Sequence, residues 1–287
     1  MGPRRIGIVG YGHLGKYLVE QVQTIPDLEL AFVWNRTPEA LEDQVDIKYI
    51  LRDLEAFSER NADLIVEVAH PDITLNYGDK FLQKADYMIG SPTAMADIET
   101  ERKLKAAANQ HGLYVPCGAL WGGQDIKKMA DRGTLQALKI TMKKPPQSLK
   151  LAEPLKSKND AVTNEAVTLY DGPVRDLCPL APNNVNTMAA AAVAAHSLGF
   201  DKTQGSIISD PSLTDWHIVQ VDVWGPGNIS EGTAFHCQTV RRNPAKIGQV
   251  TGSATYASFL SSVVRTVKDQ VSIYVDIVHT DLNKRIE

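Results

Sequence analysis

The chain has 287 residues, of which 43% are hydrophobic and 22% charged, and its formal net charge at pH 7 is -4. These values are typical of a globular protein with one large or two modest domains. The slightly acidic balance argues against a nucleic-acid partner or an anionic membrane surface, both of which attract basic proteins. No apolar run approaches the roughly 20 residues that a membrane-spanning helix needs, so we expect no membrane insertion.

Two further features favour a cytoplasmic protein. The first five residues lead directly into an apolar run, which leaves no room for a signal peptide. The cysteines Cys117, Cys178 and Cys237 are widely spaced and odd in number. They form neither a metal-ligand pair nor a disulfide framework, so we expect a reducing compartment and no bound metal.

The first predicted elements are a strand over residues 6–9, a tight turn and an amphipathic helix. The turn has the spacing Gly-x-Gly-x-x-Gly. Gly10 would permit the tight turn, Gly12 would let the backbone approach a pyrophosphate, and Gly15 would let the helix pack close to the strand. The helix N-terminus would offer N–H groups and partial positive charge to phosphates. The predicted cofactor-binding residues here are Gly10, Gly12, His13, Leu14 and Gly15.

A β-rich run over residues 28–34 ends at Asn35 and Arg36. In a Rossmann unit an acidic residue at this point binds the 2′-hydroxyl of NAD, whereas an arginine accommodates the 2′-phosphate of NADP. Asn35 and Arg36 are therefore predicted to contact the cofactor and favour acceptance of NADP, alongside NAD. Alternatively, Arg36 only stacks over the adenine, which serves either cofactor.

Strands and helices alternate through the first 118 residues. Strands are predicted over residues 63–71, 87–91 and 113–118, and helices over residues 75–82 and 99–110. This order predicts an α/β fold with a doubly wound parallel sheet, whose ligands bind at the carboxyl ends of the strands. Ala69 and His70 lie at such an end and are predicted to contact the cofactor. His70 either touches the nicotinamide with its side chain or is a loop histidine whose backbone makes the functional contact.

The pattern changes at Ala119. We expect a helix over residues 122–131, a strand over 138–144, an exposed polar connection over 150–164, and an antiparallel hairpin over 217–224 and 233–240. A helix over 248–267 would return to the first domain and precede a last strand over 271–278. The predicted domains are residues 1–118 plus about 246–287, which bind the dinucleotide, and 119–245, an α+β domain of mostly antiparallel sheet for catalysis and dimerisation.

Two places in the second domain carry candidate chemistry. Asn184 or Asn186 either caps the alanine-rich helix that follows and ends at Gly199, or points an amide at the cofactor or an anionic substrate. His217 begins a strand after a turn-rich loop. A lone histidine there is usually a packing residue, but a dehydrogenase needs a group that titrates near neutrality. Lys143 or Lys144 either adds positive charge or belongs to a solvated strand end.

The chain resembles the L-aspartate dehydrogenase family, and above all its animal members. The resemblance runs from residue 6 to about 255. It is carried by the glycine motif, by Cys-Gly-Ala-Leu-Trp-Gly-Gly-Gln-Asp at 117–125, Lys-Lys-Pro-Pro at 143–146, Tyr-Asp-Gly-Pro at 170–173, Pro-Asn-Asn-Val-Asn at 182–186, Asp210-Pro211 before His217, and Asn243-Pro244.

The resemblance implies a Rossmann domain followed by an α+β domain with the active site, usually assembled as a homodimer. Ala119 and Asn186 match cofactor-binding positions, and His217 matches the catalytic acid/base. The implied reaction is oxidation of L-aspartate by NAD or NADP to iminoaspartate, then hydrolysis to oxaloacetate and ammonia. The alternatives are a reductase of the dihydrodipicolinate-reductase type, whose basic-histidine motif is not seen in the second domain, and a non-catalytic NADP-binding sensor or scaffold.

Overall fold

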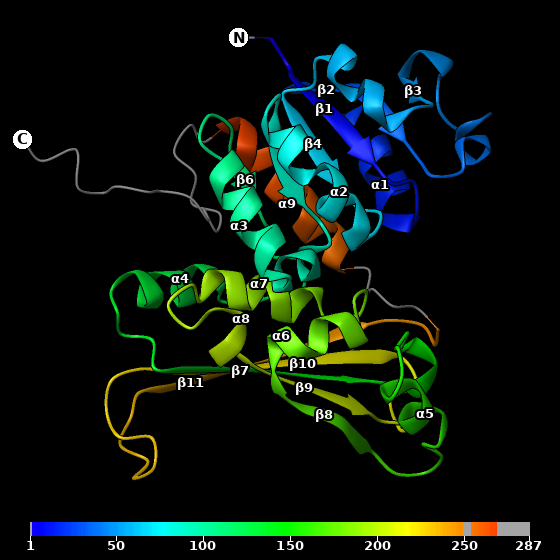
Figure 1. The fold of residues 1–287 in the computed structure, drawn as a ribbon. Coiled ribbons are helices and arrows are strands. Elements are labelled where there is room, and N and C mark those ends of the chain that lie inside the picture. Colours follow the sequence, from blue (N-terminus) through cyan, green and yellow to red (C-terminus); the bar gives the residue numbers. More distant parts are fainter. Residues whose placement is uncertain (1, 249–253, 269–287) are drawn as a thin grey trace, which may run out of the picture. The chain divides into compact units, whose positions relative to one another are not determined.

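The computed structural model describes residues 2–248 and 254–268, which fold into two compact units (Figure 1). Among the described residues, the first unit consists of 2–91, 98–116 and 263–268, and the second of 92–97, 117–248 and 254–262. The bounds of these compact units differ slightly from those of the predicted domains. Residues 92–97 belong to the second unit, where the Thr93 hydroxyl donates a hydrogen bond to the Pro182 carbonyl at 2.9 Å.

The first unit contains a six-stranded sheet with the order β3-β2-β1-β4-β5-β6, in which all neighbouring strands run parallel. The strands are β1 (Arg4–Val9), β2 (Leu28–Trp34), β3 (Ile50–Leu51), β4 (Leu64–Glu67), β5 (Asp86–Ile89) and β6 (Leu113–Tyr114). The predicted doubly wound parallel sheet is confirmed. Strand β6 ends four residues earlier than predicted. It is an edge strand, and Pro116 has no N–H to continue the ladder.

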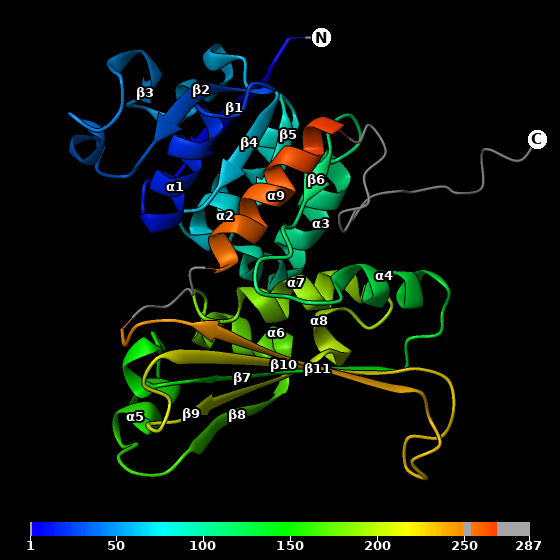
Figure 2. The same cartoon turned by 180° about the vertical axis from the view of Figure 1, so that it is seen from behind.

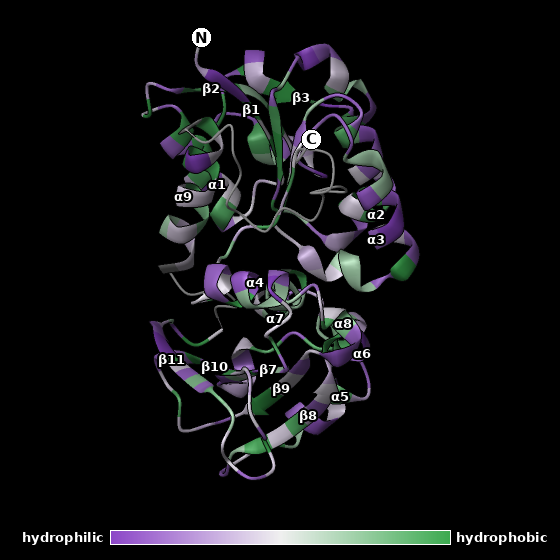
Figure 3. Ribbon diagram, turned by 90° about the vertical axis from the view of Figure 1, so that its left-hand side faces the viewer, coloured by the Kyte–Doolittle hydropathy of each residue, from purple (hydrophilic) through white to green (hydrophobic). Residues whose placement is uncertain are grey.

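Helices cover both faces of this sheet. They are α1 (His13–Val22), α2 (Pro71–Leu82), α3 (Ile98–Ala107) and the last residues of α9 (Ala254–Lys268). Figure 3 shows α1 and α9 on one side of the sheet and α2 and α3 on the other. Central strand β1 is therefore buried on both faces: Ile8 and Val9, whose side chains point to opposite faces, have no exposed surface. Three short 3-10 helices lie between β2 and β4: Pro38–Leu41, Ile47–Tyr49 and Leu54–Arg60.

The second unit is built on a five-stranded sheet with the order β11-β10-β7-β9-β8. Its strands are β7 (Ala137–Lys144), β8 (Val167–Pro173), β9 (Gln204–Ser209), β10 (Trp216–Trp224) and β11 (His236–Pro244). The pair β7–β9 is parallel and the other three pairs are antiparallel, which confirms the mostly antiparallel sheet. The second hairpin strand begins at His236, three residues later than predicted. Residues 225–235 form a longer loop, closed by a bond from the Gly225 amide to the Phe235 carbonyl (Figure 2).

The helices of the second unit are α4 (Gly123–Asp131), α5 (Leu155–Asp160), α6 (Val174–Leu177), α7 (Asn186–Ala194), α8 (Gly199–Lys202) and the start of α9. Short 3-10 helices lie at Pro92–Ala96, Pro146–Ser148 and Cys178–Leu180. Figures 1 and 2 show α4, α6, α7 and α8 on one face of the sheet. A Cβ added at Gly205 of β9 would lie 2.8 Å from the Met188 sulfur of α7, so helix and sheet are in close contact.

Three further predictions of helices and connections in this unit differ from the structure. Residues 150–164 are not merely an exposed connection, because they contain α5, whose Leu155 and Asn159 side chains are buried. The alanine-rich helix ends at Ala194 rather than Gly199, because Ala195 leaves the helical conformation with a ψ of 49°. Gly248, where the last helix was predicted to begin, lies in a turn, and the described part of α9 begins at Ala254. The strand predicted over 271–278 lies outside the described residues. Within residues 2–248 and 254–268, no helix has the length and apolarity to cross a membrane.

Candidate functional site

The glycine motif forms the turn between β1 and α1, and its three glycines have different roles. Gly10 has a φ of 113°, and a Cβ there would lie 2.8 Å from the Val68 carbonyl group. A Cβ at Gly15 would lie 2.1 Å from the Gly10 oxygen. The fold itself thus requires both glycines. Gly12 has an ordinary φ of -74° and no atom within 4 Å of an added Cβ, so the fold does not require it.

Gly12 is also the N-cap residue of α1. Having no side chain, it provides no cap for the free N–H groups of the first helical turn, and that turn contains no acidic residue. A diphosphate would fit at this turn, because the space is open and the helix end provides free amides and partial positive charge. Next in the helix, His13 is exposed and Leu14 half-buried. The geometry therefore fits the dinucleotide that the sequence predicts at this turn.

Asn35 connects the end of β2 to the glycine turn. Its amide oxygen accepts a hydrogen bond from the Tyr11 N–H at 3.2 Å, and its amide nitrogen donates to the Thr37 carbonyl at 2.9 Å. The exposed Arg36 side chain follows directly. Since β2, β1 and β4 are neighbours in the sheet, the residues predicted at these three strand ends lie along one edge of the first unit.

His70, beyond the end of β4, is the N-cap residue of α2. Its Nδ1 atom accepts a hydrogen bond from the Asp72 N–H at 3.3 Å and lies 3.1 Å from the Asp72 carboxylate. The imidazole therefore has a structural role of its own, and its contact with the cofactor stays a prediction. Ala69, the residue before it, is exposed at the same strand end.

Glu67 is a residue of this edge that the sequence analysis did not select. Its side chain is completely buried and accepts bonds from the Ala69 N–H at 2.6 Å, the Ser91 N–H at 2.9 Å and the Ser91 hydroxyl at 3.1 Å. Burial raises the pKa of Glu67 to about 7. Glu67 thus ties the loop after β4 to the loop after β5. In the sequence, a carboxylate at the end of an apolar strand was the signal that could have identified Glu67.

We expect the ionisation of Glu67 to make stability depend on pH. Because its pKa is about 7 in the folded state against an ordinary 4.5, the folded state binds the proton more tightly. The stabilisation is complete below about pH 4.5 and is lost as the pH rises through about 7. At about 1.4 kcal/mol per pKa unit, the free energy of unfolding falls by about 3 kcal/mol.

Urea unfolding between about pH 5 and pH 8 measures this fall. Glu67→Gln cannot ionise, so the part of the fall that Glu67 causes should be absent from it. Glu59→Gln, which changes an exposed glutamate, should behave like the wild type. Parallel stability curves for all three proteins would show that Glu67 does not titrate in this range.

His217 lies at the start of β10 in the second unit, with 3% of its surface exposed. Its Nε2 atom is buried and has no hydrogen-bond partner in the part of the chain that the structure describes. Burial, and then the positive charge of Lys144, lower the pKa of His217 to about 4. In the free protein the imidazole is therefore neutral at pH 7 and titrates well below the near-neutral range expected from the sequence, because its site is buried and positively charged. Its Nε2 atom is available to a ligand.

The strand registers place polar residues beside His217. The pairing of Ile218 with Lys143 puts Lys144 next to His217, and Asn243 pairs with His217 from β11. Lys144 is 3% exposed, and burial lowers its pKa to about 8. A solvated strand end is therefore wrong for Lys144, because alternate residues of β7 point to opposite faces and Lys144 is on the covered one.

Asn186 is the first residue of α7, and its amide oxygen lies 3.4 Å from the Thr93 hydroxyl. Neither candidate asparagine caps this helix, because the N-cap residue is Val185. Asn184 instead accepts from the Lys150 N–H at 2.8 Å and donates to the Ser148 carbonyl at 3.1 Å. The capping prediction is therefore wrong, since tertiary contacts use the Asn184 amide.

Ala119 is half-buried in a turn of the second unit. The turn is closed by a bond of 2.8 Å from the Leu120 N–H to the Cys117 carbonyl. Like Asn186 and His217, Ala119 belongs to the second unit, whereas the other predicted cofactor residues belong to the first.

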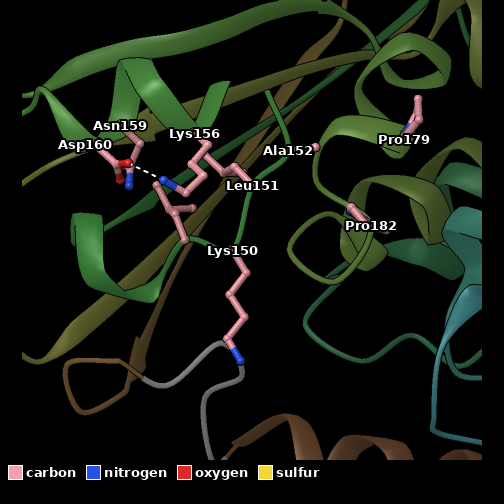
Figure 4. Close-up of a pocket in the computed structure, with 9 residues that line it drawn as sticks. Lys150, Leu151, Ala152, Lys156, Asn159, Asp160, Pro179 and Pro182 are labelled. Atoms are coloured by element: carbon pink, nitrogen blue, oxygen red, sulfur yellow. Dashed lines mark hydrogen bonds and ion pairs between the residues drawn. The ribbon is translucent and has the colours of Figure 1, made fainter. Parts of the chain in front are cut away.

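A pocket of about 470 Å³ lies within the second unit and was not predicted (Figure 4). Its polar wall includes Lys156 and Asp160, whose charged groups pair at 2.6 Å, and the buried Asn159. The Ser209 hydroxyl donates to the Asn159 amide oxygen at 2.7 Å. Because Ser209 pairs with Lys144 in the sheet, polar groups lead from this pocket towards His217.

These observations define a protein whose first unit is a Rossmann-type dinucleotide-binding fold and whose second unit holds a buried histidine. Residues 10–116 match the family described as "Homoserine dehydrogenase, NAD binding domain", and residues 125–262 match "Aspartate dehydrogenase, C-terminal".

The chain is 56% identical over 265 residues to the aspartate dehydrogenase domain-containing protein of Xenopus tropicalis, covering 91% of this chain and 93% of that protein. It is 30% identical over 219 residues to the L-aspartate dehydrogenase of Methanocella arvoryzae, covering 73% and 79%. Its fold resembles the crystal structure of aspartate dehydrogenase from Thermotoga maritima, with a TM-score of 0.67, 20% identity and coverage of 94% and 97%. The chain therefore belongs to the aspartate dehydrogenase family, and the resemblance seen in its sequence is confirmed.

Proposed function

We propose that this protein is an NAD(P)-dependent L-aspartate dehydrogenase. It would oxidise L-aspartate at Cα to iminoaspartate, which water hydrolyses to oxaloacetate and ammonia. Membership of the aspartate dehydrogenase family supports the substrate class. The observation that carries the proposal is the neutral imidazole of His217, buried with its Nε2 atom free of a partner among the described residues.

The glycine turn would hold the cofactor's diphosphate, and Asn35 with Arg36 would hold the adenosine ribose. The remaining proposed contacts are Ala69, His70, Ala119 and Asn186. When bound, the nicotinamide would accept the hydride from the substrate Cα, and the protein supplies orientation and proton transfer.

His217 would take a proton from the substrate ammonium, or from the water that attacks the imine carbon. Both steps need an uncharged base at neutral pH. The low pKa of His217 keeps the imidazole uncharged in the free protein. Its burial keeps bulk water from competing for the ring nitrogen.

The proposed function is tested by following NADH and NADPH consumption with oxaloacetate and ammonia, and the reverse reaction with L-aspartate. We expect turnover in both directions. We also expect 2-oxoglutarate, which is one methylene longer, to react about 10-fold or more slowly. Cofactor binding without turnover on any amino or keto dicarboxylate would contradict the proposal and indicate a non-catalytic sensor.

Replacing Arg36 by alanine should distinguish the two cofactors. If the guanidinium pairs with the 2′-phosphate, losing a charge-assisted bond of roughly 1.5–3 kcal/mol weakens NADP binding by about 10- to 100-fold. NAD binding should change less than about twofold, since NAD has no such phosphate. Fluorescence titration measures both affinities. Arg52→Ala is the control, because this exposed arginine pairs with Glu42 at 3.1 Å. Equal losses for NAD and NADP would refute the phosphate contact.

A further inference from the structure

Two neighbouring side chains of the second sheet combine a positive charge with a hydrogen-bonding nitrogen that has no partner among the described residues. The antiparallel register brings Lys144 of β7 beside His217 of β10, and both side chains are on the face that the helices cover. Such cross-strand neighbours have Cα atoms about 4.5–5.5 Å apart. Lys143, by contrast, is on the opposite face and half-buried.

The members of this cross-strand row are unusually polar for an interior. Asn243 and His217 are each 3% exposed, as is Lys144, while Ser209 is completely buried. Leaving a buried nitrogen such as His217 Nε2 without a hydrogen bond costs about 1–3 kcal/mol, so such atoms are rare unless they have a use. The row therefore has the character of a binding site rather than of a core.

An α-amino acid has a pattern of charge that complements this pair. Its carboxylate and its ammonium are attached to the same carbon, so they are separated by a short distance. The Lys144 cation attracts the carboxylate and repels the ammonium, whereas the neutral His217 ring can accept a hydrogen bond from the ammonium. The two side chains can thus hold both groups in one orientation.

We propose that Lys144 binds the substrate carboxylate next to the reacting carbon and so presents the amino group to His217. This inference rests on the proposed function, because it concerns the same site. It adds a residue that selects for amino and keto acids. A bound carboxylate would also offset the Lys144 charge, one of the two causes of the low pKa of His217. Substrate binding would thereby raise the proton affinity of the base.

The polar row also extends towards a pocket of the second unit. Ser209 is the parallel-strand partner of Lys144, and its hydroxyl donates to Asn159 at 2.7 Å. Asn159 lines the pocket of about 470 Å³ (Figure 4). A pocket large enough for a four-carbon dicarboxylate therefore lies two polar residues away from Lys144.

Succinate, an unreactive dicarboxylate, is the probe for this proposal. Its dissociation constant is measured by calorimetry on the full chain saturated with NADP. We expect Lys144→Met to weaken succinate binding by about 10-fold or more, the loss of one charged hydrogen bond. Lys143→Met, which changes the adjacent lysine on the other face, should stay within about twofold of the wild type. Lys144→Arg, which keeps the charge, should retain more affinity than Lys144→Met and shows whether the position tolerates substitution.

Equal succinate affinities for Lys144→Met and Lys143→Met, or no succinate binding by the wild type, would overturn the proposal. Unfolding curves of each variant separate lost binding from lost structure. The outcomes also separate this inference from the proposed function. Succinate binding that depends on Lys144, without aspartate turnover, supports the carboxylate site and refutes the dehydrogenase. Aspartate turnover combined with a succinate affinity that does not depend on Lys144 supports the dehydrogenase and refutes the carboxylate site.

Discussion

Replacing His217 by glutamine should lower kcat for aspartate oxidation by about 10²- to 10⁴-fold, the usual contribution of a general acid–base. Glutamine preserves much of the side-chain volume and can still form hydrogen bonds, but it cannot take up a proton at neutral pH. Cofactor affinity should stay within about twofold of the wild type, because the substitution removes proton transfer and leaves cofactor binding unchanged. Steady-state kinetics and a cofactor titration measure the two effects.

His236→Gln is the matched control for this experiment. His236 is an exposed residue of β11 that stacks on Trp224 at 4.8 Å and lies 3.1 Å from the Asp222 carboxylate. The His236→Gln protein should therefore retain almost full activity. A His217→Gln protein with normal kcat would refute the assigned base, even if aspartate is the substrate.

The pH profile provides a second check on His217. Because its pKa is about 4 in the free protein, protonation should reduce kcat/KM only as the pH falls towards that value. Below it the imidazolium cannot accept a proton, so the rate falls. A loss of kcat/KM centred between pH 6 and 7 that is absent from His217→Gln would show that the imidazole is not held neutral as described.

The glycine turn gives the second large effect, through a pair of substitutions with opposite consequences. Gly15→Ala puts a methyl group 2.1 Å from the Gly10 oxygen, much closer than any normal contact. Backbone atoms cannot move aside as a flexible side chain can, so we expect a loss of about 3 kcal/mol in the free energy of unfolding. Cofactor binding should be lost with it, since α1 must shift away from the turn.

Gly12→Ala should leave the fold intact. No atom lies within 4 Å of the added Cβ, and the φ of -74° is open to any residue. Stability should stay within about 1 kcal/mol of the wild type, because the lower conformational freedom of the unfolded chain is offset by alanine being a poorer N-cap residue than glycine. The methyl group would nevertheless occupy the space proposed for the diphosphate, so NAD and NADP should each bind about 10-fold or more weakly.

Urea unfolding and cofactor titration of both variants test this pair. A stable Gly12→Ala protein that binds NAD and NADP like the wild type would refute the phosphate position. A Gly15→Ala protein as stable as the wild type would instead contradict the tight packing of α1 against the turn.

The first unit was largely predictable because its signals are local. Apolar runs of strand length, separated by segments of helical periodicity, indicated the parallel sheet, and glycine spacing indicated the turn after β1. Shorter elements were not predicted, because they carry no such local signal. Strand β3 has two residues, too few for a periodic pattern, and it exists through its pairing with Val33 and Trp34 of β2.

In the second unit, polar composition was a weaker guide. Residues 150–164 looked like an exposed connection because they are rich in lysine. Their helix α5 is held by tertiary contacts that no local pattern reports, such as the Asn159 amide donating to the Pro146 carbonyl at 3.1 Å. The Asn184 amide likewise bonds to residues about 35 positions away instead of capping the nearby helix.

The fold class of both units, the family and a short list of candidate residues could be predicted from the sequence, because periodicity, glycine spacing and motif order are properties of neighbouring residues. The polarity of each candidate's surroundings, by contrast, depends on strand pairing and helix packing. Lys143 and Lys144 are adjacent in the chain, yet the helices α4, α6, α7 and α8 cover one face of the sheet. Lys144 is therefore buried beside His217, while Lys143 is not. The environment that sets the charge of His217 comes from strands and helices far apart in the chain, and pairing and packing alone bring them together.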